Sequence, residues 1–320
     1  MTDFPSPAKE SRTVHVVAGV IRDARGRILL ARRTEGRDLA GLWEFPGGKR
    51  EPGESDEAAL VRELREELGI EARIGAPLIA VPQRYPDKRL VLDVRLVEAW
   101  QGPARGREGQ ALAWVPEERL ARYPMPPADR PVVAALREPA YYFVTPPPDA
   151  GDAWERALDR ALAAGIRRIQ LRGGSPGSPD WRRRVEAALA RCREAGAQVL
   201  LNADVGLARA LGTGLHLKAA QLAALPSRPL PDDLPVAASC HDAADLAHAE
   251  RLGCDFAVLG HVAPTPSHPG LPPLGWAGFS GLRERASLPI YAIGGLGPAD
   301  LDAARAHGAQ GVAAIRAFVD

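Results

Sequence analysis

The stretch GKREPGESDEAALVRELREELGI, residues 48–70, joins a glycine- and proline-containing loop to one amphipathic helix. Ser55 is a suitable N-cap, and Asp56 places a negative charge in the first turn, where the helix dipole favours it. Gly69 suits the left-handed conformation that ends many helices. We therefore predict a helix from Asp56 to Leu68.

This helix carries an apolar stripe beside an acidic face. The stripe has helical spacing and consists of Leu60, Val61, Leu64 and Leu68. Glu63, Glu66 and Glu67 follow at i, i+3 and i+4, so their carboxylates share one neighbouring face. Residues 56–69 contain five acidic and two basic residues, a local net charge of −3. Because carboxylates repel one another, we expect a hard cation among them, and oxygen-only ligands suit Mg²⁺ or Mn²⁺.

The spacing of these residues matches a known motif. A charge cluster alone is most often a solvated helix face, but Gly48, Glu54 and Arg62 extend the pattern. The stretch resembles the Nudix box, G-x₅-E-x₇-R-E-U-x-E-E-x-G-U, with U a bulky apolar residue. The resemblance implies an α/β/α sandwich and hydrolysis of a nucleoside diphosphate linked to a further group. It also implies that the three glutamates hold Mg²⁺, that Glu54 supports the loop–helix geometry, and that Arg62 pairs with carboxylates of the site.

Outside this motif the chain resembles the MutT branch, which sanitises oxidised purine triphosphates. The matching segments are LLARR (29–33), LWEFPGGK (42–49), REGQ (107–110) and PPAD (126–129). The resemblance implies that Arg33 and Lys49 meet substrate phosphates and that Gly47 offers a metal-facing carbonyl. It makes Glu108 an extra carboxylate that reaches the site from a loop. Tyr85 lies where an aromatic ring either stacks on a base or simply packs.

One residue departs from the MutT pattern. MutT proteins place Asn where this chain has Asp129, and that amide reads the oxidised guanine. An ionised Asp only accepts hydrogen bonds and favours a base edge with two donors, whereas a protonated Asp mimics part of the Asn pattern. The favoured reaction is the hydrolysis of 8-oxo-dGTP, or a related oxidised purine triphosphate, to the monophosphate and pyrophosphate.

Around the motif we expect strands and one further helix. The expected strands are Val14–Ile21, Arg27–Ala31, Leu78–Val81, Leu90–Ala99 and Leu112–Val115. We expect a loop at Trp43–Gly53 and a closing helix at Pro127–Leu136.

After Pro139 the rhythm changes, because short apolar strands now alternate with alanine-rich helical segments, as in βα units. We expect eight strands, at Tyr141–Thr145, Arg168–Arg172, Gln198–Asn202, Gly214–Leu217, Val236–Cys240, Phe256–Gly260, Ile290–Gly294 and Gly311–Ile315. Eight such repeats predict a compact (β/α)₈ TIM barrel. The fold class is therefore α/β, with expected domains at residues 1–138 and 139–320.

The second part, residues 140–319, resembles thiamine-phosphate synthase and the related TenI thiazole tautomerase. The matching segments are YFVT (142–145), IQLR (169–172), GLHL (214–217), SCH (239–241), AIGG (292–295) and GVA (311–313). Ala203 and Gln221 stand where the synthases place metal-linked carboxylates, and Gly174 stands where a pyrophosphate-binding lysine is expected. Synthase activity is therefore not expected.

Other barrel residues keep a functional pattern. His241 matches the residue that transfers a proton in TenI, a task suited to an imidazole, although a structural hydrogen bond is the alternative. Gly294 and Gly295 suit a phosphate site at the barrel mouth, where Arg316 adds a cation.

Two alternatives to 8-oxo-dGTP hydrolysis stay open. In the first, the N-terminal part cleaves a thiamine-pathway diphosphate and the barrel captures the product, either as a thiazole tautomerase or otherwise. In the second, the barrel is a non-catalytic module that binds a thiazole or pyrimidine phosphate.

Composition excludes several other classes of protein. A net charge of +1 over 320 residues gives no basic field for stable nucleic-acid binding. Cys192, Cys240 and Cys254 lack metal-ligand spacing and are expected to be reduced thiols. Neither a signal peptide nor a run of about 18 apolar residues is found, so we expect a cytoplasmic protein without membrane contact.

Overall fold

The computed structural model describes residues 12–147, 152–174, 177–267 and 269–318. The N-terminal part consists of β1 (Thr13–Val20), β2 (Ile28–Arg32), β3 (Trp43–Glu44), β4 (Gly47–Lys49), α1 (Asp56–Leu68), β5 (Glu71–Arg84), β6 (Arg89–Gln101), β7 (Leu112–Val115), the 3₁₀ helix η1 (Glu117–Arg122) and α2 (Arg130–Arg137).

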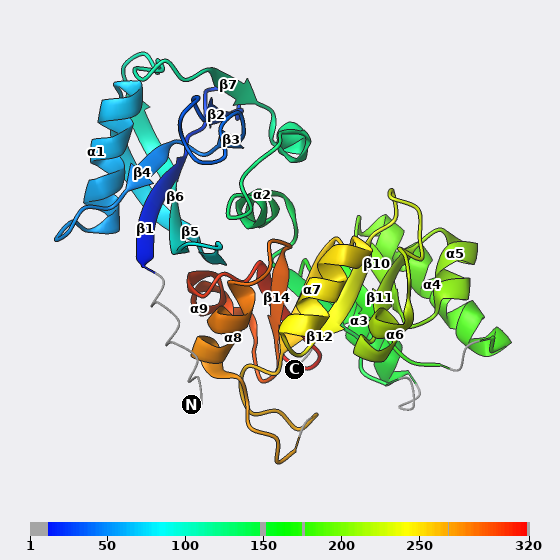
Figure 1. Cartoon of the computed structure of the whole chain (residues 1–320). Coiled ribbons are helices and arrows are strands. Elements are labelled where there is room, and N and C mark those ends of the chain that lie inside the picture. Colours follow the sequence, from blue (N-terminus) through cyan, green and yellow to red (C-terminus); the bar gives the residue numbers. More distant parts are fainter. Residues whose placement is uncertain (1–11, 148–151, 175–176, 268, 319–320) are drawn as a thin grey trace, which may run out of the picture.

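These elements form the expected α/β/α sandwich (Figure 1). One sheet has the order β4-β1-β6-β5, in which β1 runs parallel to β6, and the second sheet has the order β3-β2-β7. Side chains of α1 such as Leu60 and Leu64 pack with Val17 of β1. Val132 of α2 packs in a different cluster with Ala18 of β1. The two helices therefore cover opposite faces, because neighbouring residues of a strand point to opposite sides.

The helix α1 has the predicted ends. The Ser55 hydroxyl accepts a hydrogen bond from the Ala58 N–H at 3.2 Å, which satisfies one of the free donors of the first turn. Gly69 ends the helix with φ of 71°, in the left-handed region. Leu60, Leu64 and Leu68 are fully buried.

Three expectations about the secondary structure were incomplete. The segment Trp43–Gly53 is not all loop, because it contains the short strands β3 and β4. The strand expected at Leu78–Val81 runs over all of β5, whose register shifts against β6 hide the alternation of polar and apolar residues. The closing helix begins three residues later than expected, at Arg130, because residues 126–129 form a turn closed by the Asp129 N–H and the Pro126 carbonyl.

The C-terminal part is a closed parallel barrel of eight strands, as predicted, in the order β10-β11-β12-β13-β14-β15-β8-β9. The strands are β8 (Tyr141–Val144), β9 (Arg168–Leu171), β10 (Gln198–Asn202), β11 (Gly214–Leu217), β12 (Val236–Cys240), β13 (Phe256–Gly260), β14 (Ile290–Ile293) and β15 (Gly311–Ala314). The intervening helices are α3 (Ala153–Ala163), α4 (Pro179–Glu194), α5 (Val205–Leu211), α6 (Ala219–Ala224), α7 (Ala243–Leu252), α8 (Gly275–Arg283) and α9 (Leu301–Ala306), with the 3₁₀ helix η2 (Pro298–Asp300) before α9.

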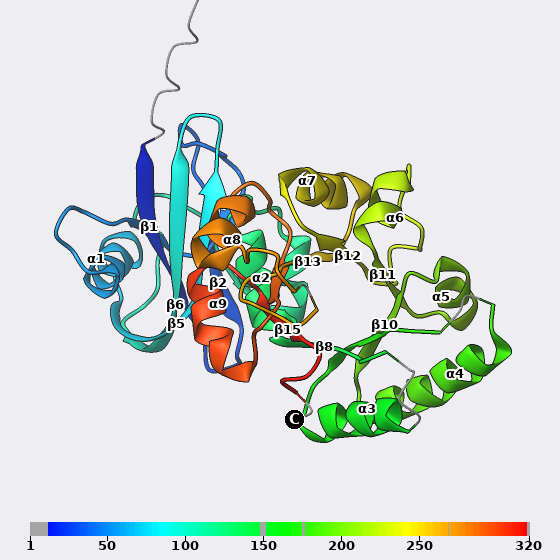
Figure 2. The same cartoon turned by 90° about the horizontal axis from the view of Figure 1, so that it is seen from below.

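The N-terminal sandwich packs beside the barrel and touches the amino ends of its strands (Figure 2). The Gln310 amide donates to the Ala134 carbonyl of α2 at 2.9 Å, and the Tyr291 hydroxyl donates to the Pro139 carbonyl. Farther out, the Arg84 N–H donates to the Glu284 carbonyl at 2.6 Å, and Arg89 forms an ion pair with the Glu284 carboxylate. The end of the β5–β6 hairpin is therefore held against the segment that follows α8.

A buried arginine lies next to this contact, immediately before Glu284. Arg283 is fully buried, and its Nε donates to the Gly308 carbonyl at 2.9 Å. Burial lowers the pKa of Arg283 to about 10, because the charged form loses hydration.

Within the described residues, no helix is long and apolar enough to cross a bilayer.

We expect Leu64→Ala to lower the free energy of unfolding by about 3 kcal/mol, because it leaves a cavity between α1 and the sheet. Urea denaturation of the N-terminal part measures this loss. Leu39→Ala is the control, since Leu39 is 42% exposed, and we expect a change within about 0.5 kcal/mol. Equal losses for both variants would contradict the packing described for α1.

Candidate active site

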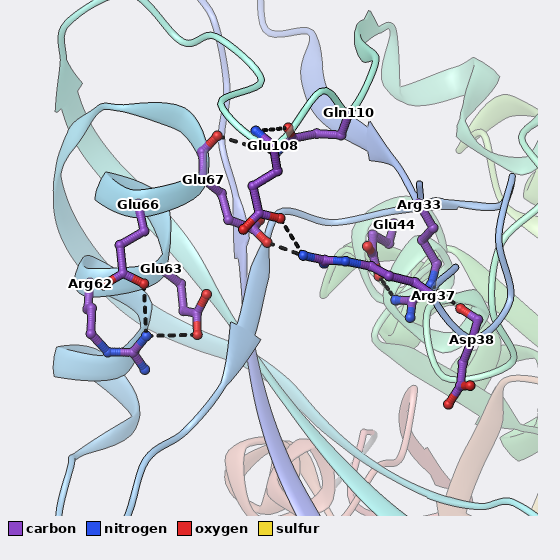
Figure 3. Close-up of polar contacts among 10 residues, drawn as sticks. All are labelled: Arg33, Arg37, Asp38, Glu44, Arg62, Glu63, Glu66, Glu67, Glu108 and Gln110. Carbon is purple, nitrogen blue, oxygen red and sulfur yellow. Dashed lines mark hydrogen bonds and ion pairs between the residues drawn. The ribbon is translucent and has the colours of Figure 1, made fainter. Parts of the chain in front are cut away.

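The Arg62 guanidinium joins three carboxylates at the start of the site, and Figure 3 shows its contacts with two of them, Glu63 and Glu66. Its Nε and Nη2 donate to the two oxygens of Glu54 at 2.8 and 2.9 Å. Its Nη1 donates to Glu63 at 2.9 Å and to Glu66 at 3.3 Å. The hydrogen bonds from Arg62 lower the pKa of Glu54 to about 2, so this loop carboxylate stays ionised.

A second arginine contacts the remaining acids. Arg37 pairs with Glu67 of α1 at 3.7 Å and with Glu108 (Figure 3). The Glu67 side chain is 10% exposed, whereas that of Glu66 is 59% exposed. Burial, with the negative charges of Glu108 and Glu63, raises the pKa of Glu67 to about 7. The fold therefore places a carboxylate beside other acids in a poorly hydrated position.

Glycine at position 48 makes room for one of these acids. A Cβ atom added to Gly48 would lie 2.3 Å from the Glu63 carboxylate. Gly48 pairs with Val17 of β1. This pairing sets how close Gly48 lies to α1. Its neighbour Gly47 is also sterically confined, because a Cβ there would lie 2.0 Å from the Val17 carbonyl oxygen. The two glycines let β4 pass close to both the sheet and the helix.

The loop that carries Glu108 is anchored to the end of α1. The Arg107 N–H donates to the Glu67 carbonyl at 2.9 Å, and the Gln110 amide donates to the same carbonyl at 3.2 Å. Gln110 also accepts the Glu108 N–H at 2.8 Å. These bonds satisfy a free carbonyl of the last helical turn and place Glu108 next to Glu67.

A second group of polar residues surrounds Asp129. Its side chain is turned away from the start of α2, where it makes no cap, and accepts the Phe45 N–H at 3.3 Å. Asp129 is 5% exposed, and burial, together with the charge of Glu44, raises its pKa to about 8. Arg33 forms an ion pair with Glu44, and its Nε donates to the Asp38 carbonyl at 2.6 Å.

Two other expected substrate contacts lie near these groups. Tyr85 is partly buried, and burial, together with the negative charge of Asp129, raises the pKa of its hydroxyl, while a hydrogen bond with the Ala128 backbone acts in the opposite direction. The side chain of Lys49 on β4 is exposed, while its carbonyl accepts a bond from Arg62 at 3.1 Å. The structure therefore places Tyr85 beside Asp129 and Lys49 beside the Arg62 cluster.

The donor chemistry of the acidic group fits a hard divalent cation. Glu63, Glu67 and Glu108 interact electrostatically with one another, and each offers carboxylate oxygens. In the part of the chain that the structure describes, no three such side chains stand in an assembled metal-ligand arrangement. Arg62 and Arg37 instead provide the positive charge that partly offsets the repulsion.

Sequence reasoning missed Arg37 and Glu44. Arg37 lies in a loop without a repeating pattern, so only the fold shows that it reaches Glu67. Glu44 lies within the segment 42–49 that carries the MutT resemblance, and its place just before Pro46, Gly47 and Gly48 is a weak signal of a site residue.

The expected barrel residues lie together around a cavity of about 570 Å³ at the carboxyl ends of the strands. His241, Gly294, Gly295 and Arg316 all line it. The His241 Nδ1 lies 3.3 Å from the Gly260 carbonyl oxygen. In parallel barrels, ligands bind at this end.

Comparisons with known proteins match the sandwich and the barrel to two different families. The NUDIX domain family matches residues 17–135, and the thiamine monophosphate synthase family matches residues 141–318. The CTP pyrophosphohydrolase of Escherichia coli (strain K12) is 47% identical over 39% of this chain and 92% of that protein. The 8-oxo-dGTP diphosphatase of the same organism is 37% identical over 39% of this chain and 98% of that protein.

The C-terminal part has relatives of its own. The thiamine-phosphate synthase of Thioalkalivibrio sulfidiphilus (strain HL-EbGR7) is 34% identical over 54% of this chain and 84% of that protein. The two matches cover different parts of the chain and together span both the sandwich and the barrel. The chain therefore belongs to the Nudix hydrolases through its N-terminal part and to the thiamine monophosphate synthase–TenI family through its C-terminal part.

Proposed function

We propose that residues 1–138 form an Mg²⁺-dependent unit that hydrolyses a nucleoside triphosphate to the monophosphate and pyrophosphate. Membership of the Nudix family makes this part a hydrolase of phosphorus-containing anhydrides. The observation that carries the finer proposal is the grouping of Glu63, Glu67 and Glu108, three mutually repelling carboxylates, on one side of the sandwich.

In this proposal Glu63, Glu66, Glu67 and Glu108 hold Mg²⁺, and the carbonyl of Gly47 contributes a further oxygen. Bound Mg²⁺ supplies positive charge to the diphosphate of the substrate. Arg33 and Lys49 bind phosphate oxygens, and one of the acidic side chains orients the attacking water. Arg62 is a positioning residue, because it links Glu54 of the loop to Glu63 of the helix.

For the base we propose 8-oxo-dGTP as the first candidate. Since its pKa is about 8, Asp129 is largely protonated at neutral pH and offers both an O–H donor and a carbonyl acceptor. This pair of groups matches the adjacent O6 acceptor and N7–H donor of 8-oxoguanine. Unoxidised guanine has an acceptor at N7 and loses the second bond.

CTP is the second candidate. The N3 and N4 positions of cytosine also present an acceptor beside a donor, so they match a protonated Asp129 equally well. The 47% identity to a CTP pyrophosphohydrolase specifically favours this candidate. The ratio of kcat/KM among 8-oxo-dGTP, dGTP, CTP and hydroxymethylpyrimidine diphosphate separates the candidates, including the thiamine-pathway alternative.

For the barrel we propose a thiazole or pyrimidine phosphate as the ligand. The support is a cavity at the carboxyl ends of the strands in which His241 and a glycine pair meet several cations.

We expect Glu67→Gln to lower the Mg²⁺-dependent release of pyrophosphate by about 100-fold or more, because it removes a charge that holds the cation and orients water. Release is measured with a coupled phosphate assay. Glu57→Gln on the same helix is the matched control, since Glu57 is exposed and outside the cluster. Similar rates for the two variants would contradict the assigned site.

We expect Gly48→Ala to lower kcat without unfolding the protein, because the added methyl group displaces the Glu63 carboxylate. Gly281→Ala is the control, since a Cβ there meets nothing within 4 Å. Steady-state kinetics and thermal melting are measured on both variants. Full activity of Gly48→Ala would show that the position of Glu63 does not matter.

We expect wild-type kcat/KM for 8-oxo-dGTP to fall, relative to Asp129→Asn, as pH rises through about 8. Ionisation removes the O–H donor of Asp129, whereas an amide does not titrate in this range. Glu44 disfavours this ionisation and Arg33 favours it. The ratio of the two proteins at each pH cancels effects common to both. A constant ratio on both sides of pH 8 would exclude a protonated Asp129 as the base-reading group.

A further inference from the structure

The cavity of the barrel contains several cations and, among the described residues that line it, no carboxylate. Arg172, Lys218 and Arg316 come from the loops after β9, β11 and β15. Among the described residues, none forms an ion pair with any of these three side chains, although arginines elsewhere in that part of the chain form many. Burial lowers the pKa of Arg172. Unpaired cations around one concave surface favour an anionic ligand.

Three described acids on or next to the neighbouring loops, Asp204, Asp242 and Asp245, are already engaged. Asp204, after β10, accepts the Leu207 N–H at 2.9 Å as the N-cap of α5. Asp242, after β12, accepts the Asp245 N–H at 2.9 Å, and Asp245 accepts the His241 N–H at 2.9 Å. These side chains satisfy backbone donors, so they are not directed to a cation in the cavity.

A neutral contact lies close to Lys218. The Gln221 amide donates to the Ala203 carbonyl at 2.8 Å, and its oxygen accepts the Lys218 N–H at 3.2 Å. These bonds use both polar atoms of Gln221 and tie the loop after β10 to the start of α6. Mg²⁺ prefers carboxylate oxygens, and neither Ala203 nor Gln221 offers one.

The floor of the cavity is neutral as well. The Asn202 amide donates to Gln170 at 3.0 Å, and the Gln170 amide donates to the Tyr142 hydroxyl at 3.1 Å. His216 lies between Tyr142 and Ser239, at 3.1 and 2.8 Å. Burial lowers the pKa of His216 to about 3, so this chain of hydrogen bonds carries no charge.

The walls indicate the rest of the ligand. Val144, Val258, Ile293, Leu296 and Ala313 give the cavity an apolar lining beside the cations. A volume of about 570 Å³ is within the range of small-molecule sites, roughly 300–1,000 Å³. The chemical class that fits is a small ring compound with one or two phosphate groups.

We propose that the barrel binds this phosphorylated ligand without a divalent cation, and that Lys218 supplies the positive charge for its phosphate. The inference rests on the proposed phosphorylated ligand, but it adds the residue and the metal independence. Arg172 and Arg316 are the other two cations that line the cavity. A lysine acts here as a point charge on a flexible stem, which suits a phosphate in more than one orientation.

The test is calorimetric titration of the full chain with inorganic phosphate, a probe that complexes Mg²⁺ only weakly. We expect the same Kd in EDTA and in excess Mg²⁺. We expect Lys218→Met to weaken binding at least about tenfold, while Arg251→Met, which removes an exposed cation on α7, leaves Kd unchanged. The thermal melting curve of Lys218→Met should equal that of the wild type, which controls for folding of the barrel.

The possible outcomes are distinct. Binding that requires Mg²⁺ would overturn the metal independence and leave the phosphorylated ligand in place. Equal loss in Lys218→Met and Arg251→Met, or no loss in either, would overturn the role of Lys218. Absence of any phosphate binding would overturn the proposed barrel ligand itself, without bearing on the hydrolase.

Discussion

The ionic contacts of Arg62 are the interaction on which the N-terminal site depends. One guanidinium holds Glu54 of the loop and Glu63 of α1, and it also donates to the carbonyl of Lys49 on β4. Three segments with no continuous hydrogen-bond ladder between them are thereby fixed in one geometry. Because the side chain is 24% exposed, its charge remains partly hydrated and the contacts avoid the full cost of burying ions.

The same arrangement explains why the acids of α1 differ from one another. Glu66 is exposed and shares Arg62, whereas Glu67 points toward Glu108 and away from bulk water. Sequence spacing places the three glutamates on one face but does not distinguish them. Burial makes the difference, since desolvation is the main cause of the raised pKa of Glu67.

Local patterns were sufficient for much of the fold. The ends of α1 follow from Ser55 and Gly69, and the barrel strands follow from short apolar runs between alanine-rich segments. The strands β3 and β4 could not be predicted, because they are held by pairing with distant segments and not by their own residues. For the same reason Arg37 could not be predicted as a site residue, since its partners Glu67 and Glu108 lie 30 and 71 positions away in the sequence. The sequence motif nevertheless named Glu54 and Arg62, and the wider MutT resemblance named Glu108; the fold brings all three to one side of the sandwich.

The docking of the sandwich at the amino ends of the barrel strands separates the two candidate sites. Gln310 and Tyr291 touch the segment around α2, whereas the cavity opens at the other end of the same strands. A product leaving one site must pass through bulk solvent to reach the other, so the fusion offers no protected passage between them. The fusion does fix the stoichiometry, because each translated chain contains one sandwich and one barrel. The two parts are therefore always made in a one-to-one ratio.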